Sequence, residues 1–332
     1  MHNNRQRQRL PLLAAVLATA LDVLSVVHAQ PRPWPDKPVK VIVPGPAGSA
    51  PDAMARLLGN KLSEVWGQTV TIENVVGASG NIGTDRVAKA PGDGYTLLYN
   101  TIGPIAVNVT LFAGKLPYDP LRDLAPISLV VKVPNLLTVH PGLPFRNVRD
   151  IIAAAKMDPG KVRYATAGPG TTQHLSGELL NLLSGIQMTG IPYKSSAQMT
   201  TDAIGGQFEL MFHNAPVVLP HIKAGSLRAL AITGLRRSPS APDVPTMVEA
   251  GVNNFEVTAW FGFMAPAATP PAVIQKISTD VARIVATPEI QARMLADASE
   301  PVGSGPDEYA AFIRTEIAKW REVVRQTNMK AE

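Results

Sequence analysis

The sequence predicts an α/β fold in two lobes, with the chain crossing between the lobes twice. Its 332 residues exceed one average domain, and strand-like and helix-like segments alternate with short turns in two blocks. Two extended stretches, residues 127–140 and 255–265, separate the central block from the rest. The predicted lobe one therefore comprises residues 30–131 plus 254–332, and lobe two comprises residues 132–253. A cleft between lobes is a favoured ligand site, and two crossing strands make a hinge.

The N-terminus is typical of a secretory signal peptide. Three arginines lie within the first nine residues, the apolar stretch Leu10–Leu21 follows, and residues 27–29 form a small-x-small cleavage site. Pro11 and Asp22 leave the uninterrupted apolar run too short for the roughly 20 residues that span a bilayer. We expect cleavage after Ala29 and a mature protein that is free in the periplasm.

Charge and cysteine content exclude several classes of protein. Without residues 1–29 the chain has 28 basic and 25 acidic residues, a net charge of +3, and the two signs are interspersed. No long basic run is present, so the sequence does not predict a nucleic-acid partner. The chain has no cysteine, which excludes disulfides, a thiol nucleophile and cysteine zinc sites.

The first block begins with a β-branched run, Val39–Val43, that predicts a buried strand. Ser49 and Asp52 have the spacing of a capping box, apolar residues then recur at three- and four-residue intervals, and Gly67 ends the helix after Trp66. The block continues with a strand, a glycine-rich loop, a short helix, a turn and another strand, at residues 69–73, 77–83, 84–90, 91–94 and 95–101. This alternation is typical of a parallel sheet covered by helices.

The second block repeats this order of elements. Asn147 is expected to cap a helix through Met157, and a loop at residues 167–172 opens a helix that runs to about Ser184. Four strands are expected, with helices between the last three, at residues 162–166, 188–191, 209–212 and 229–233. Three helices then end the chain, at about residues 271–286, 289–298 and 306–326.

No contiguous catalytic or metal-binding motif is present. The sequence lacks a G-x-S-x-G elbow and a phosphate-binding P-loop, and Gly168-x-Gly170 lacks the third glycine of a dinucleotide fingerprint. The four histidines after residue 29 have no ligand spacing, so we expect neither a metal nor a cofactor. A noncontiguous Ser/His/Asp triad stays open, because such groups assemble in space.

Three strand-to-helix loops share one composition that suits anion binding. Residues 44–52, 77–83 and 167–172 are rich in Gly, Ser and Thr, and none of the three contains Arg or Lys. At the carboxyl ends of parallel strands, such loops leave backbone N–H groups unpaired at a positive helix N-terminus. We therefore expect backbone amides, helped by serine and threonine hydroxyls, to hold an anion, and Arg56 to lie on a solvated helix face.

With neighbouring positions at two further strand ends, these loops supply the candidate ligand-binding residues. They are Pro46, Ala47, Gly48, Ser49, Asp52, Ser79, Gly80, Asn81, Thr101, Gly103, Ala167, Gly168, Gly170, Thr171, Thr172, His213 and Asn214.

Around these loops the sequence resembles the Bug (Bordetella uptake gene product) family, the substrate-binding receptors of tripartite tricarboxylate transporters. The resemblance rests on an ordered set of short motifs between about Trp34 and the C-terminus: Val43-Pro44-x4-Ser49, Gly80-Asn81-Ile82-Gly83, Asp93-Gly94-Tyr95-Thr96-Leu97-Leu98, Leu116-Pro117-Tyr118-Asp119-Pro120, His174-Leu175-Ser176-Gly177-Glu178-Leu179, Pro192-Tyr193-Lys194, Leu219-Pro220-His221-Ile222-Lys223-Ala224-Gly225, Asp243-Val244-Pro245-Thr246 and Trp260-Phe261-Gly262.

The resemblance implies a periplasmic, two-lobed Venus-flytrap fold that captures a small carboxylate and delivers it to membrane permease subunits. The carboxylate would be a dicarboxylate, a tricarboxylate or an aromatic acid, the protein a monomer, and the activity binding without catalysis. Some positions depart from the family pattern: Gly45 and Ser49 in the first loop, Pro104 and Ile105 after Gly103, Ser195 after Tyr193-Lys194, and His213 where an aspartate is usual. Ligand identity therefore does not transfer from a relative.

His213 suggests a preference for diacids, if its side chain faces the cleft. A histidine in place of a carboxylate removes a negative charge and offers one donor and one acceptor when neutral. We expect such a site to favour an acid whose distal end is anionic or an acceptor, a dicarboxylate or an aromatic acid, over an amino acid. We also expect it to bind diacids more tightly toward pH 6, where imidazole begins to protonate.

Two alternatives of other classes remain open at the level of sequence. The same fold can present its closed form to a membrane signalling partner, as a sensory receptor. A periplasmic hydrolase would need a Ser/His/Asp arrangement in the cleft.

Overall fold

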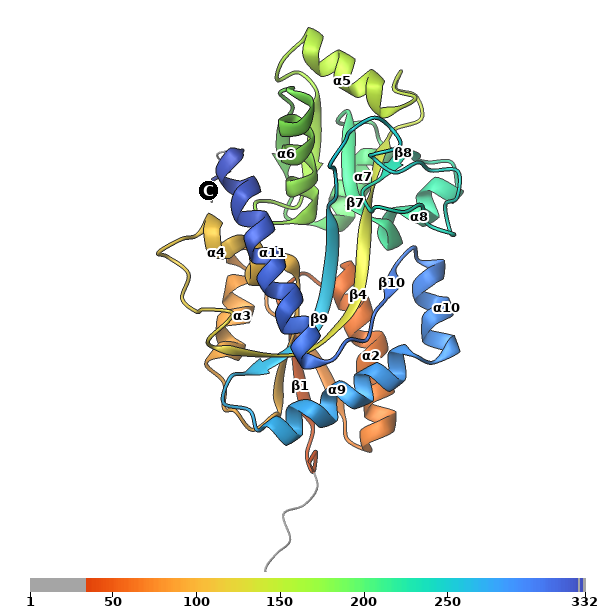
Figure 1. The fold of residues 1–332 in the computed structure, drawn as a ribbon. Coiled ribbons are helices and arrows are strands. Elements are labelled where there is room, and N and C mark those ends of the chain that lie inside the picture. The colour runs from red at the N-terminus through yellow and green to blue at the C-terminus, as the bar shows by residue number, and fades with distance from the viewer. Residues whose placement is uncertain (1–33, 328, 331–332) are drawn as a thin grey trace, which may run out of the picture. The chain divides into compact units, whose positions relative to one another are not determined.

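The computed structural model describes residues 34–327, 329 and 330 (Figure 1), so the predicted signal peptide lies outside the described residues. Lys37–Glu332 form one compact unit, and the arrangement below is that of this unit. Among the described residues, no helix is long and apolar enough to cross a bilayer.

The first sheet, here called the β1 sheet, is built from parallel strands as the sequence predicts. Strand β1 (Val39–Val43) pairs in parallel with β2 (Val70–Asn74) on one side and β3 (Thr96–Asn100) on the other. Helix α2 (Ala50–Trp66) connects β1 to β2 and ends at Gly67, which has the left-handed conformation that a glycine cap allows. The predicted strand, helix and stop signal are confirmed here.

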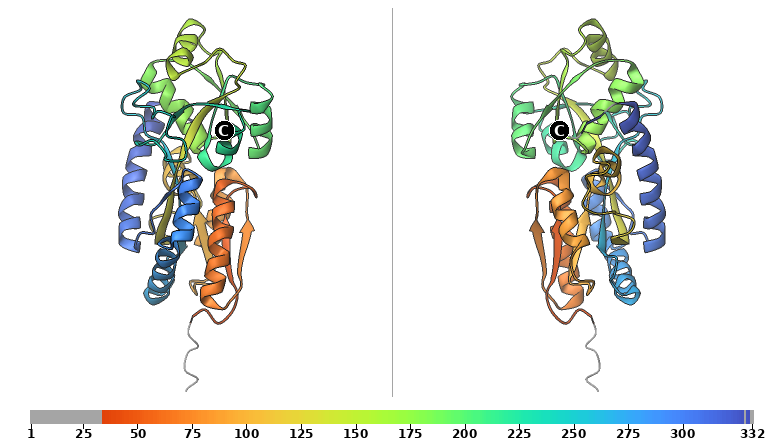
Figure 2. Two further views of the ribbon diagram at one scale, coloured as in Figure 1. Left: turned by 90° about the vertical axis from the view of Figure 1, so that its right-hand side faces the viewer. Right: turned by 90° about the vertical axis from the view of Figure 1, so that its left-hand side faces the viewer.

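The second sheet, here called the β5 sheet, repeats this arrangement. Its strands β5 (Arg163–Thr166), β6 (Thr189–Pro192) and β7 (Leu210–Asn214) pair in the order β7-β5-β6 with β5 parallel to both neighbours. Each strand is followed by a helix: α6 (Thr172–Ser184), α7 (Ser196–Ile204) and α8 (Ala215–Lys223). Three helix N-termini therefore begin at the carboxyl edge of one sheet (Figure 2).

Two long strands connect the sheets. Strand β4 (Leu124–Val139) lies antiparallel to β9 (Thr258–Pro266) from Leu124 to Pro134, and from Asn135 onward it pairs instead with β7 and β8 (Arg228–Ile232). Both extended stretches of the sequence are therefore strands, and strand pairing runs from β2 to β6 through β4. Figure 1 shows β4 and β9 side by side between the helices of the two sheets.

The remaining elements cover the sheets. Helix α11 packs against β4, and α9 packs against both β4 and α2. In chain order these elements are η1 (Ala78–Gly80), α3 (Asn81–Ala88), η2 (Gly103–Val107), α4 (Asn108–Leu111), α5 (Val148–Met157), α9 (Pro271–Val285), α10 (Pro288–Ala296), β10 (Glu300–Pro301) and α11 (Pro306–Gln326).

Two stretches differ from the sequence-based expectation. Helix α3 begins at Asn81 instead of Thr84, because the left-handed Gly80 already turns the chain into the helix. Residues 103–111 are helical, starting with a short π-helical turn, although Pro104 and a continuous apolar run gave no amphipathic pattern there. Every residue of that turn is buried, so its sequence has no alternation between apolar and polar positions that would indicate a helix.

Thr233 joins the two crossing stretches where β4 changes partners. Its buried hydroxyl donates to the carbonyl of Val257 at 2.6 Å and accepts from the backbone amide of Asn135 at 2.8 Å. The Thr233 amide in turn donates to the Asn135 carbonyl, and the Val257 amide donates to the Thr233 carbonyl. One residue thus supplies hydrogen bonds to both strands at the predicted hinge.

We predict that Thr233→Val lowers the free energy of unfolding by about 1–3 kcal/mol, because the buried Asn135 amide loses its acceptor. Urea denaturation measures this loss. Thr138→Val, on β4, is the control, since the Thr138 hydroxyl makes a single bond, to the Met211 carbonyl. Equal effects of the two substitutions would contradict a special role for Thr233.

Candidate functional site

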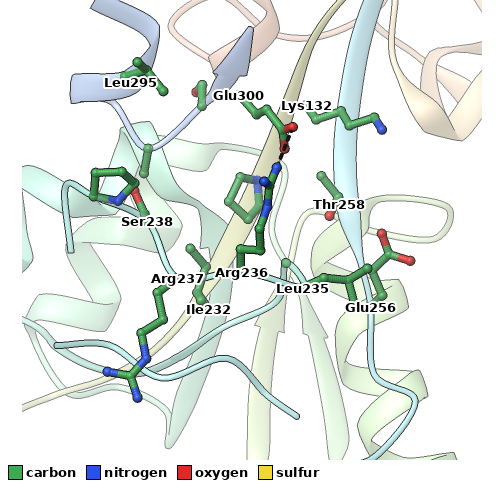
Figure 3. Close-up of a pocket in the computed structure, with 15 residues that line it drawn as sticks. Lys132, Ile232, Leu235, Arg236, Arg237, Ser238, Glu256, Thr258, Leu295 and Glu300 are labelled. Carbon is green, nitrogen blue, oxygen red and sulfur yellow. Dashed lines mark hydrogen bonds and ion pairs between the residues drawn. The ribbon is translucent and has the colours of Figure 1, made fainter. Parts of the chain in front are cut away.

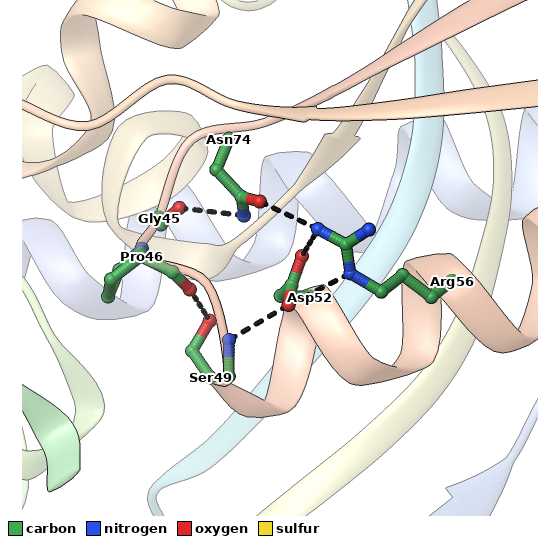
Figure 4. Close-up of polar contacts among 7 residues, drawn as sticks. Gly45, Pro46, Ser49, Asp52, Arg56 and Asn74 are labelled. Carbon is green, nitrogen blue, oxygen red and sulfur yellow. Dashed lines mark hydrogen bonds and ion pairs between the residues drawn. The ribbon is translucent and has the colours of Figure 1, made fainter.

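The first loop, residues 44–52, is held by a carboxylate inside it. Asp52, on the first turn of α2, accepts from the Gly48 amide at 2.9 Å and forms an ion pair with Arg56 at 2.9 Å (Figure 4). Arg56 also donates to Asn74, whose amide donates to the Gly45 carbonyl. Arg56 is exposed as expected, and its hydrogen bond to Asn74 links α2 to the end of β2.

The capping box expected at Ser49 and Asp52 does not form. The Ser49 hydroxyl donates to the Pro46 carbonyl at 2.6 Å and makes no cap bond, while Asp52 binds the amide one residue earlier, that of Gly48. Burial raises the pKa of Asp52, but the hydrogen bonds from Arg56 and Gly48 outweigh it and hold the pKa below the ordinary 3.8. Asp52 is therefore a charged support of the loop.

The second loop, residues 77–83, has an unusual backbone. Four consecutive residues, from Gly77 to Gly80, have positive φ, including the non-glycine residues Ala78 (45°) and Ser79 (55°). Such conformations cost free energy and persist only where the surroundings enforce them. Here the Asn108 amide donates to both the Ser79 carbonyl and the Asn81 side-chain oxygen, at 3.1 and 2.6 Å. The buried Asn81 thus anchors the loop.

The third loop, residues 167–172, presents unpaired amides. Thr171 is the N-cap of α6, and its hydroxyl donates to the Gly168 carbonyl at 2.6 Å. The backbone amides of Thr172 and Gln173, both buried residues in the first turn, have no acceptor among the described residues. Unpaired N–H groups at a positive helix N-terminus are suited to bind an anion.

The loops of the two sheets meet. A methyl group built on Gly103 would lie 3.1 Å from the Gly170 carbonyl and 3.7 Å from that of Ser79. One built on Gly80 would lie 3.0 Å from the Pro44 carbonyl. A side chain at these positions would make the neighbouring backbone give way by a few tenths of an ångström, so glycine allows the closest approach. The structure therefore brings the candidate loops of both sheets into one cluster.

A buried polar network lies beneath the third loop. The Asn135 side-chain oxygen accepts from the Thr172 hydroxyl at 3.3 Å and from the Asn214 amide at 2.9 Å, and its amide donates to Ser176 at 3.1 Å. Thr172 and Asn214, two of the predicted site residues, therefore share one partner on β4. Of the other predicted residues, Pro46, Ala47 and Ala167 are exposed, while Thr101 and Gly168 are half-buried.

His213 is buried and neutral in this structure. It is 2% exposed, and its Nε2 lies 2.8 Å from the Ser196 hydroxyl oxygen. Burial lowers its pKa to about 4. Protonation near pH 6, on which the expected tightening of diacid binding depends, is therefore disfavoured in this buried position, because burial desolvates the imidazolium.

The pair of Ser196 and His213 is not a catalytic dyad. A Ser/His pair needs a base that accepts the serine proton and an acceptor on the second ring nitrogen. Nδ1 of His213 has no hydrogen-bond partner among the described residues, and the lowered pKa makes the ring a weak base. Ser196 is not among the residues predicted from sequence; the signal that could have found it is the second strand-to-helix junction of the β5 sheet, Ser195-Ser196 after β6.

A separate cavity of about 460 Å³ lies at the crossing strands (Figure 3). Lys132, Thr258 and the segment 234–239 are among its walls, and none of the predicted site residues line it. Its charged groups already pair with one another or with neighbours, for example Arg236 with Glu300 at 2.9 Å. It also lacks the helix N-termini of the loop cluster, so we place the candidate site at the loops. Among the described residues, no group of acidic or histidine side chains could hold a metal ion.

This architecture is that of a two-lobed periplasmic binding protein, which captures a ligand and does not transform it. Residues 54–329 match the tripartite tricarboxylate transporter family receptor, so the chain belongs to this family, the TctC/Bug receptors. Protein BugT of Bordetella pertussis is 39% identical over 298 residues, which cover 90% of this chain and 91% of BugT.

Solved structures of similar proteins share this fold. Rpa4515 of Rhodopseudomonas palustris, solved with adipate, has a TM-score of 0.85 and 36% identity, with 90% of this chain and 99% of that chain covered. MatC of the same organism, solved with malate, has a TM-score of 0.81 and 31% identity, with 88% and 100% covered. The periplasmic binding protein BugD has a TM-score of 0.83 and 33% identity, with 90% and 99% covered.

We predict that Asp52→Asn lowers the free energy of unfolding at pH 7 by about 1–3 kcal/mol, because the ion pair with Arg56 is lost. Since the folded-state pKa of Asp52 lies below its unfolded value, the carboxylate stabilises the fold above about pH 4 and loses this effect as the pH falls through the folded pKa.

Urea denaturation of both proteins from pH 7 to pH 3 tests this, and the difference between them should shrink with acidification. Glu64→Gln, on the exposed face of the same helix, is the control and should have little effect at any pH. A difference for Asp52→Asn that stays constant with pH would refute the assignment.

Proposed function

We propose that the protein captures a small dicarboxylate between its lobes in the periplasm and delivers it to the membrane subunits of a tripartite tricarboxylate transporter. The observation that carries this proposal is the pair of unpaired amides of Thr172 and Gln173, at the N-terminus of α6 next to the contact between the loops. Adipate and malate in the two solved relatives support a diacid over a tricarboxylate or an aromatic acid.

The chemistry of the cluster supports an anion held without a bound cation. Three of the candidate hydroxyls are engaged within the protein, because Ser49 donates to Pro46, Thr171 to Gly168 and Thr172 to Asn135. These three hydroxyls support the loops, and the backbone amides remain for the ligand. Uncharged donors bind a carboxylate at a smaller cost of desolvation than an arginine would incur.

We further propose that lobe one comprises residues 30–131 and 254–332, that lobe two comprises residues 132–253, and that closure bends the chain where β4 changes partners. Closure would press the loop at Gly170 against Gly103, and opening would separate them. Export requires removal of residues 1–29, so the N-terminus of the periplasmic protein should be Gln30, which mass spectrometry of the secreted pool would identify.

The first test of this function is calorimetry with a series of carboxylates that includes adipate, malate, citrate, benzoate and glutamate. We expect a diacid to bind and glutamate to bind more weakly or not at all. A ligand that binds only the folded state also raises the melting temperature, so a thermal-shift series provides an independent measurement. Failure of every acid to bind would overturn the proposed function.

A second prediction concerns the contact between the loops. Gly103→Val should weaken binding of the preferred acid by about tenfold or more, because its side chain would collide with the Gly170 carbonyl and hold the lobes apart. Gly305→Ala, where a methyl group meets no neighbour, is the matched control and should bind as the wild type does. If Gly103→Val binds normally, the contact does not belong to the closed site.

A further inference from the structure

Ser196 lies at the junction between a strand of the β5 sheet and the helix that follows it, as does the third loop, residues 167–172. It is the first residue of α7 and lies four residues beyond Pro192, the end of β6. Strand β6 pairs in parallel with β5, so the N-termini of α7 and α6 begin at the same sheet edge. Ser196 is half-buried, and its hydroxyl oxygen makes one described hydrogen bond, to His213.

The direction of that bond follows from the other ring nitrogen of His213. Neutral imidazole carries its proton either on Nε2 or on Nδ1. With the proton on Nδ1, a buried N–H group would have no protein acceptor among the described residues; with the proton on Nε2, only a lone pair stays unpaired. Unpaired buried N–H groups are the rarer of the two in folded proteins, so Nε2–H donates to Ser196.

Ser196 then differs from Ser49, Thr171 and Thr172, which each donate their proton to an acceptor within the protein. The Ser196 oxygen instead accepts a hydrogen bond from His213, which leaves its own O–H without an acceptor among the described residues. A hydroxyl held in this way keeps its proton for an acceptor on the ligand, which suits a carboxylate.

We propose that Ser196 donates a hydrogen bond to a carboxylate of the ligand and that His213 is the positioning residue that fixes the direction of this donation. This inference rests on the proposed function and identifies the hydroxyl group that would bind one carboxylate of the diacid. The ring stays neutral across ordinary pH, since burial lowers the pKa of His213 to about 4. The preference for an acid over an amino acid would therefore come from a hydrogen bond and not from a positive charge.

The tautomer can be tested without any ligand. In the ¹⁵N-histidine-labelled, ligand-free protein, long-range proton–nitrogen correlation spectra distinguish a protonated Nε2 from a protonated Nδ1. The His213 signals are identified by their absence in His213→Gln. We expect protonated Nε2 and unprotonated Nδ1 between pH 5 and pH 8. Protonation of Nδ1, or a second proton above pH 6, would overturn the proposal.

Calorimetry with adipate and malate tests the role of Ser196. Ser196→Ala should weaken the acid that binds best by about tenfold or more, the loss expected for a hydrogen bond to a charged group. Ser195→Ala is the matched control, because that hydroxyl only caps α7 by accepting from the Gln198 amide. Its affinity should stay within about threefold of the wild type.

Two substitutions at His213 distinguish positioning from packing. His213→Gln keeps an amide donor toward Ser196 and should retain affinity within about threefold. His213→Asp places an acceptor there, so the Ser196 proton turns away from the ligand, and affinity should fall at least as far as in Ser196→Ala. Ligand-free melting temperatures verify that each variant folds.

The proposed function and the proposed roles of Ser196 and His213 can fail separately. If the wild type binds neither adipate nor malate nor any other acid, the proposed function fails. If the wild type binds and Ser196→Ala binds equally well, the role of Ser196 fails while the function stands. If His213→Gln and His213→Asp lose affinity equally, His213 acts only through packing and the positioning role fails.

Discussion

The structure depends on the hydrogen bonds of Asn135, the residue at which β4 leaves one sheet and joins the other. Its backbone pairs with Thr233, which also binds the second crossing stretch at Val257. Its side chain binds Thr172 and Asn214, which begin or precede helices at the candidate site. Asn135, which has no exposed surface, therefore connects the predicted hinge to the third loop. Buried polar groups tolerate little loss of geometry, so the proposed bending at this point would strain this network.

Local signals determined much of the fold that could be predicted from sequence. Strand β1 and the glycine stop after α2 depend on neighbours within a few residues, and both are where the sequence puts them. The capping box at Asn147 and Asp150 forms as well. The antiparallel pairing of β4 with β9 was not predicted, because residues more than a hundred positions apart leave no local pattern. The helical turn at residues 103–107 was missed for a related reason, since full burial removes periodicity.

The sequence predicted which loops would form the candidate site, but not the hydrogen bonds of their hydroxyl groups. Glycine-rich loops after parallel strands indicate where a ligand lies, and the contact of Gly103 with Gly170 brings such loops together. Which hydroxyl keeps a free proton depends on partners distant in sequence, such as the Asn135 oxygen for Thr172. The burial of His213 against Ser196 is likewise a property of the folded β5 sheet. Composition alone could not show which hydroxyls already donate within the protein and which are available to a ligand.

Strand β4 belongs to both sheets, which limits where this receptor can be cut into fragments. Because Leu124–Pro134 completes one sheet and Asn135–Val139 the other, a chain cut within β4 leaves each fragment with an open strand edge. Such edges pair with other chains, so isolated lobes would aggregate instead of folding alone. Chimaeras that exchange lobes with relatives should therefore be joined outside β4 and β9, and both strands should come from the same parent.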